Sequence, residues 1–250
     1  MKPISIIIMS LFLWSCAQEK ALTADEIIQK AIVEACSGNC DSAEIAFTFR
    51  KLKYRSVRQN GQFSLQRSFT DSLGSVRDEL TNDGFRRYRN DSLVKVADTM
   101  VSRYAESVNS VHYFAQLPYG LNAPAVNAEL LGTAIINDQP YYEIGITFDQ
   151  EGGGTDYEDE FVYWIHKENF HVDYLAYKYA VNGGGIRFRE AYNPRKVQGI
   201  RFVDYNNYKP ESLNVELIDL DRLFLNDALQ LLSKIETEEV AVKRINTTFE

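Results

Sequence analysis

Short strands separated by regularly spaced turns dominate residues 43–94. From Ala43 the stretch AEIAFTF alternates apolar and other residues, and such alternation is typical of a half-buried strand. Turn signals then recur about every 8 to 12 residues, a spacing that indicates an antiparallel meander. They lie at Asn60-Gly61, Asp71 to Gly74, Asn82 to Gly84 and Asn90-Asp91. A phase slip between Phe49 and Leu52 predicts a β-bulge at Arg50-Lys51.

A second meander is predicted from about Thr133 onward. We expect its strands near residues 140–149, 157–166, 170–180, 186–193 and 197–208. Two triple-glycine segments fall between these strands, and no phosphate-loop pattern accompanies either one, so both are interpreted as hairpin turns. Because successive turns of a meander alternate between ends, the two glycine loops should share one rim of the sheet. The residues expected on this rim are Asp149, Glu151, Gly153, Asp156, Gly184, Arg187 and Arg189.

Helical periodicity interrupts the strands at three places. Thr23 and Glu26 form a capping-box pattern that predicts a helix over 24–36. A second helix is expected over 98–116, with an apolar stripe that would face the concave side of the sheet and any ligand there, formed by Val101, Tyr104, Val108 and Val111. A short helix is expected from Ala123 to Leu131. For the tail, we prefer a helical turn near 219–224 and a closing strand near 231–245 over one continuous helix.

The amino terminus contains a short apolar run that ends beside a cysteine. Lys2 precedes an apolar run from Ile4 to Trp14, which is too short to span a bilayer, and Ser15-Cys16 follows. Leu13-Trp14-Ser15-Cys16 resembles a lipobox, which implies cleavage before Cys16 and a lipid on its thiol. We therefore expect a signal peptide (1–15), a lipidated tether (16–22) and a single domain (23–250) anchored to a membrane of the bacterial envelope, the outer membrane being preferred.

The net charge and the cysteines limit which partners and metal sites this chain can have. The formal net charge of −8 argues against a nucleic-acid partner, which would require a clustered basic face. Cys36 and Cys40 could close a local disulfide in an oxidising compartment or remain as two thiols. No further cysteine or suitably spaced histidine completes a metal site. No cofactor is expected.

No catalytic constellation emerges from the polar motifs. His112 is interpreted as a helix-packing residue, and His166 and His171 as surface residues that a turn could bring close together. The acidic run from Asp156 to Glu160 could supply a general acid and base or calcium ligands. In a strand, however, its side chains would divide between two faces, so a solvated sheet face is the preferred interpretation.

The order of these elements indicates one resemblance to known proteins, and several sequence segments indicate a second. Helix, strands, inserted helix and further strands, together with YWIHKENFHVDYLAY, resemble the LolA/LolB type of lipoprotein-carrier fold. That resemblance implies an incomplete barrel with an apolar interior. The segments TNDGFRRY, SVNSVHYFAQLPYGLN, QEGGGTDYEDEFVYWI and DYLAYKYAVNGGGIRFREAYN resemble an uncharacterised family of Bacteroidota envelope lipoproteins, which implies no particular activity.

The sequence therefore predicts an α+β fold that is mainly antiparallel β: a curved meander sheet, LolA-like, with helices covering its concave face. The leading functional hypothesis is a non-enzymatic envelope lipoprotein that holds a lipid or other apolar ligand in a half-barrel. The alternative is a lipid-tethered module that docks a protein or glycan and has a filled interior; the sequence identifies no protein partner. A hydrolase that uses the acidic run is the least favoured hypothesis. An apolar cavity of at least about 300 Å³ would distinguish the first hypothesis from the second.

Overall fold

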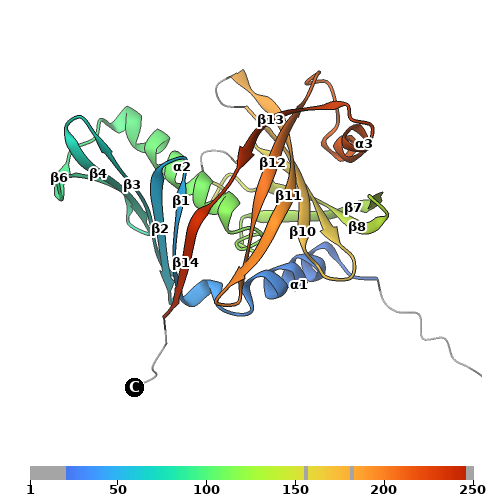
Figure 1. The fold of residues 1–250 in the computed structure, drawn as a ribbon, viewed down its shortest axis with the longest axis horizontal. Helices are drawn as coiled ribbons and strands as arrows, with labels where there is room; N and C mark the ends of the chain where they lie inside the picture. The colour runs from blue at the N-terminus through green and yellow to red at the C-terminus, as the bar shows by residue number, and fades with distance from the viewer. Residues whose placement is uncertain (1–20, 155–156, 181–182, 246–250) are drawn as a thin grey trace, which may run out of the picture.

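The computed structural model describes residues 21–154, 157–180 and 183–245 and contains two curved antiparallel sheets (Figure 1). In spatial order, the first sheet contains β14 (Glu238–Arg244), β1 (Ala43–Phe49), β2 (Leu52–Gln59), β3 (Gln62–Asp71), β4 (Gly74–Thr81), β5 (Gly84–Arg89) and β6 (Ser92–Val94). The second contains β13 (Leu229–Ile235), β12 (Ile200–Pro210), β11 (Gly185–Val197), β10 (Val172–Tyr179), β9 (Glu160–His166), β8 (Gln139–Phe148) and β7 (Val126–Ile136). The predicted fold class, with two meanders and an inserted helix, is confirmed.

The predicted curved sheet is two sheets, and each of them has seven strands among the described residues. The single closing strand predicted near 231–245 is replaced by two strands, β13 and β14. β13 pairs with β12 in the second sheet, and after residues 236–237 the chain continues as β14, which pairs with β1 in the first sheet. Figure 1 shows this tail as one path along both sheets. The two sheets are thus joined by the chain rather than by a shared ladder.

The bulge expected at Arg50-Lys51 is instead a two-residue hairpin turn. Phe49 and Leu52 are paired directly, and φ is +48° at Arg50 and +67° at Lys51. Positive φ at both central positions is the geometry of a type I′ turn, whose twist matches that of the flanking strands. The signals at Asn60-Gly61 and Asn90-Asp91 form hairpin turns as predicted.

Helix α1 (Ala24–Cys36) has the predicted bounds and the predicted capping box. The Thr23 hydroxyl accepts a 3.2 Å hydrogen bond from the Glu26 amide, and the Glu26 carboxylate accepts one of 2.8 Å from the Thr23 amide. Its apolar face packs on the second sheet through Ile27 and Ile28, which are buried. Just beyond it, Cys36 and Cys40 form a disulfide, so the thiol alternative does not apply to this structure.

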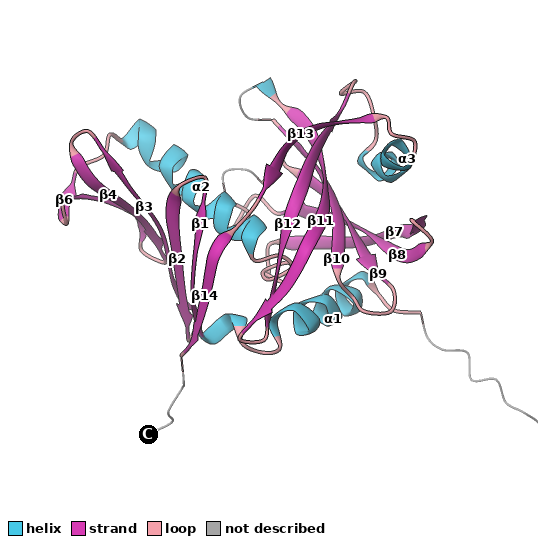
Figure 2. Cartoon of the chain, viewed as in Figure 1, coloured by secondary structure: helices cyan, strands magenta, loops and turns pink. Residues whose placement is uncertain are grey.

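Helix α2 (Asp98–Ala115) lies between the two sheets (Figure 2). On one side, buried His112 donates a 3.0 Å hydrogen bond from Nε2 to the Gln66 carbonyl oxygen of β3. On the other side, the Tyr113 hydroxyl shares a 2.7 Å hydrogen bond with Tyr163 of β9. The helix therefore fixes the position of both sheets, and His112 is the packing residue that the sequence predicts.

The helix expected over Ala123–Leu131 is wrong. Residues 126–136 are strand β7, which pairs along its length with β8 from Val126↔Phe148 to Ile136↔Gln139. Ala, Glu and Leu favour a helix locally, but strand pairing supplies a tertiary interaction that local propensity does not include.

The opposite face of the second sheet has its own core. Trp164 and Phe188 are fully buried there, under the helices η3 (Leu217–Asp219) and α3 (Leu220–Leu225). His166, expected at the surface, is 5% exposed, with its ring against Tyr141. The surface assignment is wrong because an aromatic neighbour and Gln139, within hydrogen-bond distance of Nε2, cover the ring. The predicted proximity of His166 to His171 is found in the backbone, where the His166 amide donates to the His171 carbonyl oxygen.

Candidate functional site

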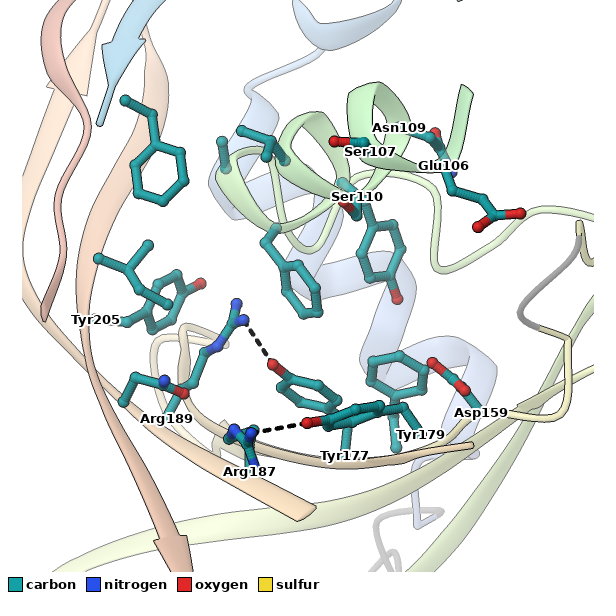
Figure 3. Close-up of a pocket in the computed structure, with 18 of the residues that line it drawn as sticks. Glu106, Ser107, Asn109, Ser110, Asp159, Tyr177, Tyr179, Arg187, Arg189 and Tyr205 are labelled. Atoms are coloured by element: carbon teal, nitrogen blue, oxygen red, sulfur yellow. Dashed lines mark hydrogen bonds between the residues drawn. The ribbon is translucent and has the colours of Figure 1, made fainter. Parts of the chain in front are cut away.

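A cavity of about 680 Å³ lies between α2 and the second sheet; we call it the central cavity (Figure 3). Its floor is one face of the sheet, because the strand residues that line it are spaced by two: Tyr177 and Tyr179, then Arg187 and Arg189, then Val203, Tyr205 and Asn207. Successive strand residues point to opposite faces, so this spacing presents one continuous wall. The turn at Phe49 and Arg50 closes one side.

Aromatic rings form most of the apolar surface of the central cavity. The rings from α2 and β9 and β10 contact one another: Phe114 lies 5.3 Å from Tyr177 and 6.4 Å from Phe161 between ring centroids. Phe148 meets Phe161 edge to face at 5.8 Å. Such contacts fix the rings in place beyond what area burial alone supplies. The wall is therefore preformed rather than assembled by a ligand.

Two arginines enter this aromatic wall from β11. Figure 3 shows Arg187 bonded to Tyr179 and Arg189 bonded to Tyr177, and both hydrogen bonds measure 2.7 Å. Arg189 is 7% exposed, and its guanidinium carbon lies 3.8 Å from the centroid of Phe114. Each arginine thus pairs with a phenol oxygen and an aromatic face.

Tyr113 and Tyr205, two of the tyrosines that line the cavity, remain protonated at neutral pH. Burial is the main cause that raises the pKa of Tyr205 to about 12, and it raises the pKa of Tyr113 further. These hydroxyls therefore offer neutral hydrogen-bonding groups and no negative charge. Through these two residues the cavity offers hydrogen-bonding groups beside its apolar surface, and neither of the two supplies a base.

Only some of the residues predicted to lie on the rim line the central cavity. Gly153, Arg187 and Arg189 line the central cavity, whereas Glu151 and Gly184 do not. Asp156 lies outside the described residues. The pairing of β9 with β8 and with β10 confirms the meander and puts the glycine loops at the same end of the sheet.

Of the apolar stripe predicted on helix α2, likewise only a part lines the cavity. Val111 lines the cavity, but Val101, Tyr104 and Val108 do not. Tyr104 packs on Phe85 and beneath Arg87 of β5, because this face of α2 lies against the first sheet, whereas Arg103 and Glu106 of the same turn line the cavity. Val108 is fully buried and Val101 is half-buried.

Most residues of the cavity wall were not predicted from the sequence. Tyr113, Phe114, Tyr177 and Tyr205 were not expected at a site, although the alternation of aromatic residues along the predicted strands contains the signal. Asp159 also lines the cavity while Glu158 and Glu160 are exposed, so the acidic run divides between two sides as expected.

Residues 21–154, 157–180 and 183–245 contain neither a metal-ligand cluster nor a membrane-spanning helix. No group of three or more His, Cys, Asp or Glu side chains in these ranges could hold a metal ion. No helix within them is both long and apolar enough to cross a bilayer. Cys16 and the proposed signal peptide lie outside the described residues.

Comparison with solved structures shows a shared fold. A LolA superfamily protein from Nitrosomonas europaea aligns over 90% of this chain and 96% of its own, with a TM-score of 0.50 and 13% identity. A DUF1329 family protein from Desulfovibrio piger aligns over 91% and 95%, with a TM-score of 0.45 and 11% identity. The lipoprotein LppX from Mycobacterium tuberculosis aligns over 63% and 89%, with a TM-score of 0.28 and 12% identity. The fold assignment depends on the first of these alone.

Sequence comparison identifies the family. No curated protein matches the chain. A family model matches residues 2–237, which include the helices and all strands except β14. This chain therefore belongs to the DUF6503 family, a family of unknown function, and has a LolA-like fold.

Proposed function

We propose that this protein is a non-enzymatic component of the bacterial envelope that holds a lipid or another apolar ligand in the central cavity. The observation that carries the proposal is the cavity itself, with a volume of about 680 Å³ and walls of aromatic rings. Small-molecule sites are concave, mostly apolar and about 300 to 1,000 Å³ in volume. A filled interior would have favoured the docking-module alternative.

The energetics favour an acyl chain as occupant. Each methylene transferred from water into an apolar wall contributes about 0.8 kcal/mol. Ten methylenes therefore contribute about 8 kcal/mol before the cost of losing translational freedom and chain flexibility is subtracted. Because the aromatic wall is preformed, little of this free energy is spent on ordering the protein.

The membrane anchor is a separate part of the proposal. We infer that Cys16 carries lipid, which places the domain beside a bilayer, and a LolA-like fold accords with a role in an envelope. Cys16→Ala should abolish incorporation of a labelled fatty acid and release the protein from membranes in a carbonate wash. Equal retention of the variant would contradict the anchor and leave the cavity proposal intact.

The binding proposal is tested with the uncharged probe N-phenyl-1-naphthylamine and the full chain. Fluorescence should rise on mixing and fall when unlabelled dodecanol competes. Ser110→Trp, which places a large ring in the cavity lining, should reduce probe affinity about tenfold or more. Thr99→Trp, on an exposed position of α2 away from the cavity, is the matched control and should bind like the wild type. Equal binding by both variants would contradict a ligand in this cavity.

A further inference from the structure

The faces of the Arg189 guanidinium are occupied by aromatic rings. Its central carbon lies 3.8 Å from the Phe114 centroid, 5.0 Å from that of Tyr177 and 5.9 Å from that of Tyr205. Aromatic faces attract a cation, and the attraction strengthens where water is excluded. These contacts explain how a positive charge is tolerated at 7% exposure. They do not supply hydrogen-bond acceptors for its N–H groups.

Most of the N–H groups on the edges of the same guanidinium lack a hydrogen-bond acceptor in the described part of the chain. Nη2 donates to the Tyr177 hydroxyl, but Nε and Nη1 are buried with no hydrogen-bond partner among the described residues. These two nitrogens carry three of the five N–H donors of an arginine. Leaving a buried donor unsatisfied costs about 1 to 3 kcal/mol, and more when the group is charged. A buried cation with several open donors requires an explanation.

We propose that Arg189 binds the anionic head group of the ligand, so that the cavity selects acidic amphiphiles with a carboxylate or phosphate head. This inference rests on the proposed function, because the head group needs a chain that occupies the cavity. A carboxylate or phosphate oxygen accepts charge-assisted hydrogen bonds from a guanidinium, which are roughly twice as strong as neutral ones. Both head groups would satisfy the open donors, and in both the aromatic wall would receive the apolar chain.

The charge around the cavity accords with an anionic ligand. Three further arginines line it, Arg50, Arg103 and Arg187, against the carboxylates of Glu106 and Asp159. The whole chain carries a net charge of −8, so this excess of positive groups is local. Burial at Arg189 keeps the interaction in a region of low dielectric, where it is stronger than at the surface.

The test compares head groups on one chain length. Dodecanol, laurate and dodecyl phosphate compete with N-phenyl-1-naphthylamine for the full chain at pH 8. At least one of the two anions should displace the probe at a concentration about tenfold or more below that of dodecanol. Preference for laurate would identify a carboxylate head group, and preference for dodecyl phosphate a phosphate. Equal potency of all three would overturn the head-group proposal, whereas failure of the probe and dodecanol to bind would instead contradict the proposed function.

Two variants test whether Arg189 is the residue that causes the preference for anionic head groups. In Arg189→Met, which keeps a long apolar stem, the potency ratio of the anion to dodecanol should fall to near one. Arg77→Met is the matched control: Arg77 stacks on Tyr88 at 4.0 Å in the first sheet, and its removal should leave the ratio unchanged. Near-ultraviolet circular dichroism checks that each variant folds. If Arg189→Met does not fold, Arg189→Lys is used instead. Its potency ratio of anion to dodecanol should lie between the wild-type value and one. A wild-type ratio in the folded Arg189 variant would overturn the proposal.

Discussion

The backbone amide of Thr237 donates a 3.0 Å hydrogen bond to Oδ1 of Asp204. Thr237 belongs to the two-residue link between β13 and β14, and Asp204 is a buried residue of β12. Arg195 pairs with the same oxygen at 3.0 Å, and Asn193 donates to Oδ2 at 2.7 Å. One buried carboxylate thus holds the irregular part of β11 and the point where the chain changes sheets.

Asp204→Ala should lower the free energy of unfolding by about 3 kcal/mol, because it removes the acceptor of the Thr237 amide and the carboxylate that pairs with Arg195. Urea denaturation measures the change. Asp204→Asn keeps an acceptor but loses the charge, and should fall between the wild type and the alanine variant. Equal stability of all three would contradict this function of Asp204.

Asp78 accepts hydrogen bonds from two arginines of the first sheet. Its carboxylate is fully buried, 2.6 Å from Nη2 of Arg67 and 2.5 Å from Nε of Arg87. Asp78→Ala should cost about 3 to 5 kcal/mol, since it leaves two nearly buried guanidinium groups without a counter-ion. Asp71→Ala, which breaks the more exposed pair with Arg89, is the control and should leave the denaturation midpoint almost unchanged. Similar midpoints for both variants would show that burial of Asp78 does not decide its contribution.

Because of His112, the free energy of unfolding should decrease as the pH is lowered from 7 to 5. Burial is the main cause that lowers its pKa from 6.5 to about 4, and the Gln66 carbonyl oxygen accepts from its neutral ring. Between pH 6.5 and 4 the unfolded chain binds a proton at this site while the folded chain does not, so unfolding is favoured as pH falls. The loss by pH 5 should be about 2 kcal/mol.

His112→Gln isolates this effect, because the variant cannot gain the proton. Its free energy of unfolding should change less between pH 7 and pH 5 than that of the wild type, by about 2 kcal/mol. His171, whose pKa burial also lowers, is unchanged in both proteins and cancels in the comparison. Parallel pH profiles would show that protonation of His112 is not linked to folding.

The disulfide between Cys36 and Cys40 closes a short loop at the end of α1. A cross-link of roughly five residues lowers the entropy of the unfolded chain enough to contribute about 2 kcal/mol. The double variant with Cys36→Ala and Cys40→Ala should therefore have a free energy of unfolding about 2 kcal/mol lower than the wild type. Its urea denaturation midpoint should fall accordingly. No shift in the midpoint would contradict this contribution.

Elements defined by local chemistry could be predicted from the sequence. The Thr23–Glu26 capping box and the Asn60-Gly61 turn depend on residues adjacent in the chain, and both are found. Arg50-Lys51 could not be identified as a turn, because neither residue favours positive φ and strand pairing imposes it. Residues 126–131 were assigned to a helix for a related reason, since only pairing with β8 makes them a strand.

The candidate site was predictable only in part. Arg187 and Arg189 were expected on a polar rim, but the burial of Arg189 results from Phe114, which α2 brings from a distant part of the sequence. The cavity wall likewise combines residues from β1, α2 and β8–β13. Periodicity indicates which residues share a face of one element, but not which faces meet across a cavity.

Photolabelling shows whether the cavity between α2 and the second sheet holds an apolar chain. A dodecanol analogue with a diazirine near its methyl end is irradiated with the full chain, and the attachment sites are mapped by mass spectrometry. We expect labelling of the aromatic wall, at Phe114, Phe161 or Tyr177, and we expect excess dodecanol to suppress it. Labelling confined to exposed leucines such as Leu231 and Leu232, with no suppression by dodecanol, would contradict binding in this cavity.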